Sequence, residues 1–239
     1  MTATTTHPAF RQPSDQSGRV WRYMDFTKYV SLLESSALYF SRLDQLGDNF
    51  EGSITVATKK SLDSPDVALR DDLRAAMQSQ TTSLRHTIRE GTYVNCWHMS
   101  EHESAAMWRL YSKTEEAISV QTSYGKLVDA LSNELLVGLV NYIDYDNEII
   151  PSNNMLWPVM HKRLSFQHEC EVRAVFGIDV ADDSPLGKSV SVDLAALVEN
   201  VYVSPESPDW FYQLVCDLTE KMGGTFTIVR SRLSEQPVF

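Results

Sequence analysis

The segment from Ser165 to Phe176 places three charged side chains at alternate positions of what is otherwise an apolar strand. Successive residues of a strand point to opposite faces, so Glu169, Glu171 and Arg173 are predicted to share one face. The apolar run that follows favours a central place in a sheet, where charges are costly unless they are paired or used. The sequence therefore predicts either a structural charge network or a functional site here.

The overall composition limits the class of protein. A chain of 239 residues with 43% hydrophobic content fits one domain. It has no apolar run near the roughly 20 residues that span a bilayer. The net charge of -11 argues against a membrane partner and against broad affinity for nucleic acid. Three widely spaced cysteines fit reduced thiols, so a cytoplasmic protein is expected.

Strands and helices alternate without a regular βαβ pattern. This predicts a single α+β domain over residues 19–239, with a mixed, largely antiparallel central sheet flanked by helices. Residues 1–18 are predicted to be a disordered lead-in, and residues 65–90 a charged helical arm. The expected strands span residues 19–24, 37–41, 93–99, 117–122, 136–145, 165–176, 198–203 and 225–230. The expected helices span residues 26–34, 127–131, 151–163 and 209–222, with a further helix after residue 104 that carries Met107, Trp108 and Tyr111 as a core stripe.

The loop from Gly47 to Gly52 is a second candidate site. It carries Asp48 and Glu51 between glycines, which is typical of a solvated turn. Phe50 needs a place to bury, however, and its burial would fix both carboxylates against the body of the protein. Loops fixed on a rigid scaffold often carry function.

Arg22 is a third candidate because it stands between Trp21 and Tyr23 on the first expected strand. An arginine among aromatic side chains can bind a carboxylate or a phosphate. The alternative is a structural ion pair with Glu51 or Glu171.

Other residues allow several kinds of chemistry. Two carboxylates on one face raise each other's pKa, so one glutamate could act as a base or an electrostatic stabiliser while Arg173 holds the other. His98 ends the strand that carries Trp97, and a lone histidine is more often structural. The histidine spacing predicts no metal site. A further hypothesis is a metal-dependent hydrolase or nuclease, with Asp48, Glu51, Glu169 and Glu171 gathered around a magnesium ion.

Several motifs together resemble a bacterial family catalogued as domain of unknown function 2971, over roughly residues 19–176. In the loop motif, Asn49 replaces the proline that is usual in that family. The matching segments are Trp21-Arg22-Tyr23, Leu38-Tyr39-Phe40-Ser41, Asp48-Asn49-Phe50-Glu51, Asn95-Cys96-Trp97-His98, Met107-Trp108-Arg109-Leu110-Tyr111-Ser112, Ala117-Ile118-Ser119-Val120 and Glu169-Cys170-Glu171-Val172-Arg173.

The order of Arg22 and Glu169-Cys170-Glu171 also resembles the pattern of ADP-ribosyltransferases. That resemblance implies NAD as substrate, with Arg22 on its pyrophosphate. It further implies that Glu171 stabilises the ribose cation as nicotinamide leaves and that Glu169 orients the acceptor. Tyr39 or Trp97 would stack on nicotinamide. Phe40-Ser41 or His98-Met99-Ser100 stand where those enzymes carry a Ser/Thr motif.

The sequence thus predicts an enzyme that transfers ADP-ribose from NAD or hydrolyses NAD, such as a bacterial toxin or a phage-defence effector. Its acceptor would be a small molecule or a protein, and a protein partner or antitoxin would bind it. The alternative is a non-catalytic module that binds a small ligand or a protein. Such a module would use the same carboxylates, Arg22 and Arg173.

Overall fold

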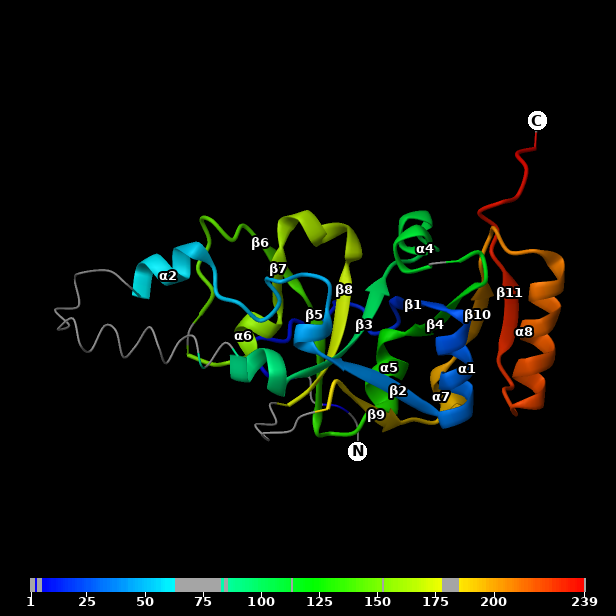
Figure 1. Cartoon of the computed structure of the whole chain (residues 1–239), viewed down its shortest axis with the longest axis horizontal. Helices are drawn as coiled ribbons and strands as arrows, with labels where there is room; N and C mark the ends of the chain where they lie inside the picture. Colours follow the sequence, from blue (N-terminus) through cyan, green and yellow to red (C-terminus); the bar gives the residue numbers. More distant parts are fainter. Residues whose placement is uncertain are drawn as a thin grey trace.

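A nine-stranded sheet forms the centre of the fold (Figure 1). The computed structural model describes residues 3, 6–62, 83, 86–112, 114–151, 153–177 and 185–238. Within the described sheet every pairing is antiparallel except that of β10 with β11. The strands are β1 (Arg19–Asp25), β2 (Ala37–Arg42), β3 (Tyr93–Met99), β4 (Ala117–Ser123), β5 (Leu135–Leu139), β8 (Glu171–Phe176), β9 (Gly187–Ser191), β10 (Asn200–Val203) and β11 (Thr227–Arg230).

The remaining elements flank this sheet, and together they make the α+β domain that the sequence predicts. A separate two-stranded parallel sheet pairs β6 (Asn141–Ile143) with β7 (His161–Arg163). The helices are α1 (Phe26–Ser35), α2 (Val56–Leu62), α4 (Ala105–Tyr111), α5 (Tyr124–Ala130), α6 (Leu156–Val159), α7 (Leu194–Leu197) and α8 (Asp209–Lys221), with 3-10 helices at Leu43–Gln45 and Leu164–Glu169. None of the described helices has the length and apolar character needed to cross a membrane.

The sheet divides at β3. Strand β8 pairs along β3 from Tyr93 to His98 on one edge, so β1 and β2 must share the other edge. There β1 pairs only with the last two residues of β3, and β2 only with Tyr93 and Val94. The middle of β3 therefore lacks a strand partner on this edge within the described chain. Strands β1 and β2, which run in the same direction but do not pair with each other, diverge at this point.

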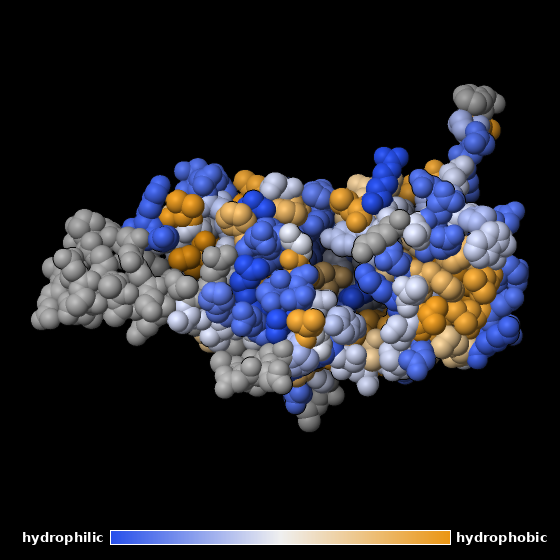
Figure 2. All heavy atoms as spheres, in the orientation of Figure 1, coloured by the Kyte–Doolittle hydropathy of each residue, from blue (hydrophilic) through white to orange (hydrophobic). Residues whose placement is uncertain are grey.

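The larger core cluster includes side chains of α1, α5 and α8 and of the sheet, among them Tyr29, Leu127 and Phe211. Apolar side chains also gather at the surface over the region of α1 and α8 (Figure 2). A smaller cluster contains Phe10 and Val159 together with Val94 of β3 and Val175 of β8. A third cluster packs Trp21 and Tyr23 of β1 against Trp108 of α4, so packed apolar side chains hold the sheet on which the candidate residues lie.

The N-terminal segment differs from its prediction in the part that the structure describes. Residues 6–18 follow the body of the protein, and the Phe10 side chain is buried. Gln12 Nε2 donates a hydrogen bond to the Val137 carbonyl oxygen at 2.8 Å, and Arg11 forms a β-bridge with Leu139. The polar composition was misleading because these few side chains find partners along β5.

Three further element predictions were wrong. Only Glu171–Phe176 is a strand in the predicted strand 165–176, since the chain before it forms a 3-10 helix and Cys170 turns with φ 40°. The predicted helix 151–163 contains the short helix α6 and then β7. The predicted strand 136–145 breaks at Val140 into β5 and β6. The predicted arm at residues 65–90 lies largely outside the described residues.

Candidate functional site

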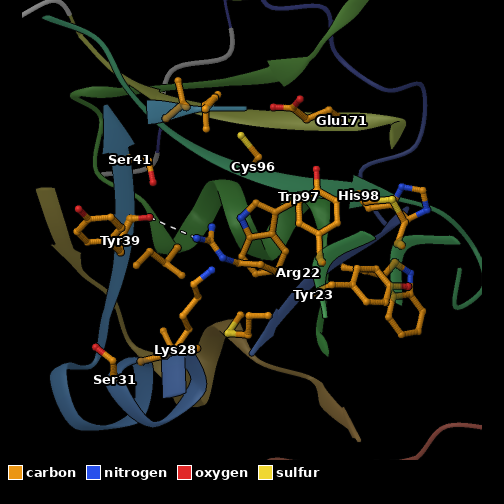
Figure 3. Close-up of a pocket in the computed structure, with 18 of the residues that line it drawn as sticks. Arg22, Tyr23, Lys28, Ser31, Tyr39, Ser41, Cys96, Trp97, His98 and Glu171 are labelled. Carbon is orange, nitrogen blue, oxygen red and sulfur yellow. Dashed lines mark hydrogen bonds between the residues drawn. The ribbon is translucent and has the colours of Figure 1, made fainter. Parts of the chain in front are cut away.

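A cavity of about 480 Å³ opens where β1 and β2 diverge (Figure 3). Its walls come from β1, α1, β2, β3 and α4 and from the chain around the start of β8. This volume lies within the range of about 300–1,000 Å³ that is typical of small-molecule sites. Of the residues that the sequence analysis singled out, the cavity brings together Arg22, Tyr39, Ser41, Trp97, His98, Glu169 and Glu171.

Arg22 extends from β1 into the gap beside β2. Its Nη2 donates a hydrogen bond to the Tyr39 carbonyl oxygen at 3.3 Å, and its guanidinium lies 5.9 Å from the ring centre of Trp97. Its Nη1 is closed to solvent and has no hydrogen-bond partner among the described residues. Burial lowers the pKa of Arg22 to about 10, against an opposing interaction with Cys96, so the side chain stays cationic at neutral pH. It makes no described ion pair with Glu51 or Glu171, which Arg173 binds instead.

Aromatic and amide side chains fix the wall beside Arg22. Trp97 is buried, and its Nε1 donates to Asn95 Oδ1 at 2.6 Å. Asn95 Nδ2 in turn donates to the Tyr39 carbonyl oxygen at 2.9 Å, which ties β3 to β2 across the gap. The Tyr39 side chain is 51% exposed, and both Tyr39 and Ser41 line the cavity. An indole held in this way offers a rigid surface for a flat ligand.

Beneath one end of the cavity lies a buried charge cluster, made up of Glu51, Lys162, Glu169, Glu171 and Arg173. Arg173 is fully buried and binds Glu171 through Nε at 2.6 Å and Nη2 at 2.9 Å. Its Nη1 also donates to Glu51 Oε2 at 3.0 Å. Lys162 Nζ lies 2.5 Å from Glu169, 3.1 Å from Glu51 and 3.4 Å from Glu171. Three carboxylates therefore face two cations.

The pKa directions differ among the cluster's carboxylates. Burial acts to raise the pKa of Glu171, but Arg173 and Lys162 outweigh it and hold that pKa at about 2. Burial also raises the pKa of Glu169, and here Lys162 only partly offsets it. Burial acts to lower the pKa of Lys162, but the three carboxylates around it outweigh burial and raise that pKa. Because Lys162 is shared among three carboxylates, it neutralises Glu169 only in part. Glu171 is thus a fixed anion, and Glu169 is the carboxyl better suited to exchange a proton.

The loop that carries Asp48 lies beside the cluster and does not line the cavity. Asp48 accepts a 2.7 Å hydrogen bond from Arg163 Nη2, and Glu51 reaches into the cluster. The prediction that Phe50 buries and fixes the loop was wrong, because Phe50 is 43% exposed with the Arg163 guanidinium 4.1 Å from its ring centre. The buried Glu51, rather than Phe50, anchors the loop through its contacts with Lys162 and Arg173.

Three further side chains, those of His98, Tyr111 and Cys96, line the cavity near the carboxylates. The His98 ring places Nδ1 2.6 Å from the Glu169 carbonyl oxygen, and burial lowers the pKa of His98. A neutral imidazole with Nδ1–H then donates this hydrogen bond. Tyr111 was predicted to be part of a core stripe, yet it lines the cavity and its hydroxyl donates to Glu169 Oε1 at 3.4 Å. Burial raises the pKa of the lining Cys96 thiol well above its usual value.

Sequence reasoning missed two cations. Lys162 lies in the segment that was predicted to be a helix, where no pattern distinguishes it from a surface lysine. Lys28 of α1 lines the cavity on the same side as Arg22 (Figure 3). The sequence feature that could have pointed to Lys28 is its position in the first turn of the helix that follows the strand of Arg22.

The arrangement of the carboxylates does not favour the hypothesis of a magnesium-dependent enzyme. Within the described ranges, no group of three or more His, Cys, Asp and Glu residues is placed to hold a metal ion. Arg163 binds Asp48, while Lys162 and Arg173 bind the three glutamates. Each carboxylate that would be a ligand is thus already bound by a lysine or an arginine.

Neither a scan against protein-family models nor a search of curated proteins found a match for this chain. The geometry of the cavity is therefore the basis on which a function can be assigned.

Proposed function

We propose that the cavity binds NAD and that the chain cleaves the bond between nicotinamide and ribose, passing ADP-ribose to water or to an acceptor. The observation that carries this proposal is the pairing of two carboxylates, in one aromatic-lined cavity, with an arginine that lacks a carboxylate partner among the described residues. Arg22 can donate hydrogen bonds to the pyrophosphate, which is a bidentate acceptor. Trp97 offers a surface on which a flat ring can stack.

The chemistry would use the two glutamates differently. When the bond from the ribose C1′ to the nicotinamide nitrogen breaks, the electron pair leaves with nicotinamide and positive charge develops on the ribose. Glu171, ionised at neutral pH, would stabilise that charge electrostatically. Glu169 would take the proton from the attacking water or acceptor hydroxyl, a role that its raised pKa favours.

One observation favours a second candidate function, a binding module without turnover. Both oxygens of Glu171 already accept hydrogen bonds from Arg173, and Lys162 lies near one of them. A carboxylate so well satisfied stabilises a neighbouring cation less. In that case the cavity would hold its ligand without cleaving it.

A nicotinamide-release assay combined with calorimetry separates these functions. We expect the purified chain to release nicotinamide from NAD, and Glu171→Gln to lower that rate on the order of 10²-fold. Arg22→Gln should weaken NAD binding at least about tenfold, since hydrogen bonds to charged groups contribute about 1.5–3 kcal/mol. Glu34→Gln, on the exposed face of α1, is the matched control and should change neither quantity.

The outcomes are distinct. NAD binding that depends on Arg22 without nicotinamide release supports the binding module. Absence of NAD binding by the wild-type chain contradicts the proposed enzymatic function.

We place the activity in the cytoplasm, where NAD is found and where the three free cysteines stay reduced. An NAD-consuming chain there would need restraint, for which a protein partner such as an antitoxin is our proposal.

A further inference from the structure

The cavity carries opposite charges at its two ends. Arg22 and Lys28 lie on the α1 side of the cavity (Figure 3), and neither has a described carboxylate partner. Glu171 lies on the other side, with Cys96 between it and Arg22 (Figure 3). Glu169 also lines the cavity and shares Lys162 with Glu171. A ligand that spans the cavity therefore meets a cationic end and an acidic end.

The acidic end has an excess of negative charge. The buried charge cluster contains three carboxylates and two cations, and its contacts leave the members unequally neutralised. Arg173 binds Glu171 and Glu51 but makes no described contact with Glu169. Among the described residues, the Glu169 carboxylate contacts only Lys162, at 2.5 Å and shared with two other carboxylates, and the Tyr111 hydroxyl through a long hydrogen bond. The uncompensated charge lies closest to Glu169, which lines the cavity.

We propose that the cavity selects a zwitterionic ligand, with its anionic group at Arg22 and Lys28 and a cationic ring at Glu169, and that Glu169 is the specificity-determining residue for that ring charge. A positive ring beside Glu169 supplies the charge that the cluster lacks, in a site where solvent screens it weakly. The Tyr111 ring, on the same wall as Glu169, adds a surface that attracts cations. A neutral ring gains neither interaction. The inference rests on the proposed function, because it specifies which redox form of the nicotinamide dinucleotide the cavity takes.

Oxidised and reduced NAD provide the test. Both carry the same phosphates, riboses and adenine, but the nicotinamide ring is cationic in NAD⁺ and neutral in NADH. Dissociation constants are measured by calorimetry, at a protein concentration and time at which nicotinamide release is negligible. We expect the wild-type chain to bind NAD⁺ about tenfold more tightly than NADH, which corresponds to about 1.4 kcal/mol.

Two variants assign the preference to Glu169. Glu169→Gln should bring the two constants close to equality mainly by weakening NAD⁺ binding, and retained NADH binding shows that this variant is folded. Glu169→Asp keeps the charge and should keep part of the preference. Glu34→Gln removes an exposed negative charge outside the cavity and should leave the tenfold ratio unchanged.

Each result decides the question. Equal binding of both nucleotides by the wild-type chain overturns the inference and leaves the proposed function standing. So does a tenfold preference that persists in Glu169→Gln. If neither nucleotide binds the wild-type chain, the proposed function fails and the inference fails with it.

Discussion

Lys162 joins three carboxylates from a side chain that is only 8% exposed. Replacing it with methionine would keep most of the side-chain volume and leave the buried cluster with one cation. Removing one partner of a buried pair costs about 3–5 kcal/mol, because the remaining charges stay desolvated. We therefore expect Lys162→Met to lower the free energy of unfolding by about that amount, measured in urea at pH 7.

Lys126 supplies the matched control for this substitution. It pairs with Glu199 at 2.8 Å, but its side chain is 48% exposed. Exposed ion pairs contribute about 0–1 kcal/mol, so Lys126→Met should have little effect on the unfolding free energy. Equal losses from the two substitutions would show that the cluster does not stabilise the fold through Lys162.

At the scale of single residues, the sequence predicted side-chain contacts where the spacing along one strand determines them. The alternation of Glu171 and Arg173 predicted their shared face, and the two side chains do bind each other. The place of Glu169 was predicted for the wrong reason. It comes near Glu171 through a turn at Cys170 and through Lys162, which are features of tertiary structure that a period-two pattern does not encode.

At the scale of elements, the contact between the N-terminal segment and β5 depends on Gly138. A Cβ atom there would come within 2.8 Å of the Phe10 Cα and Cβ atoms. These Phe10 atoms cannot move without the backbone, so the N-terminal segment would have to move away from β5. Overpacking of this kind costs about 1–3 kcal/mol, and we expect Gly138→Ala to lower the unfolding free energy by that amount.

Limited proteolysis gives this prediction a local measurement. Displacing Phe10 should expose residues 6–18 and make them the first site of cleavage in Gly138→Ala. Gly47→Ala is the control, because a Cβ at Gly47 meets nothing within 4 Å. An N-terminal segment as resistant in Gly138→Ala as in the wild-type chain would contradict the role given to this glycine.

Element boundaries followed the sequence best where one face of a strand is buried against the core. Strand β3 has the predicted bounds, and β1 and β4 differ from theirs by one residue at one end. The cavity was not predictable in the same way. It arises because β1 and β2 pair with opposite ends of β3, and strand register is a long-range property.

At the scale of the whole molecule, the buried titratable groups make stability depend on pH. Burial lowers the pKa of His98 and of His161 below 6.5. A lowered folded-state pKa means that the unfolded chain binds the proton more readily, so stability falls as the pH drops below about 6.5. Glu171 follows the same sign, and its contribution is lost as the pH falls from 4.5 to about 2. The raised pKa of Glu169 acts in the opposite direction and reduces the net loss near pH 4.5.

Unfolding free energies measured in urea from pH 8 to pH 3 should therefore decline in two stages on the acid side. The shift in the pKa of Glu171, from 4.5 to about 2, corresponds to about 3 kcal/mol in full, of which about 2 kcal/mol is lost between pH 4.5 and pH 3. Glu171→Gln removes that titrating group, so the variant should be less stable at neutral pH and lose less stability below pH 4.5. The exposed Glu34→Gln should follow the wild-type curve. The first stage belongs to the histidines, so it should persist in Glu171→Gln. If the second stage of Glu171→Gln is as steep as that of the wild-type chain, the acid sensitivity arises outside the buried charge cluster.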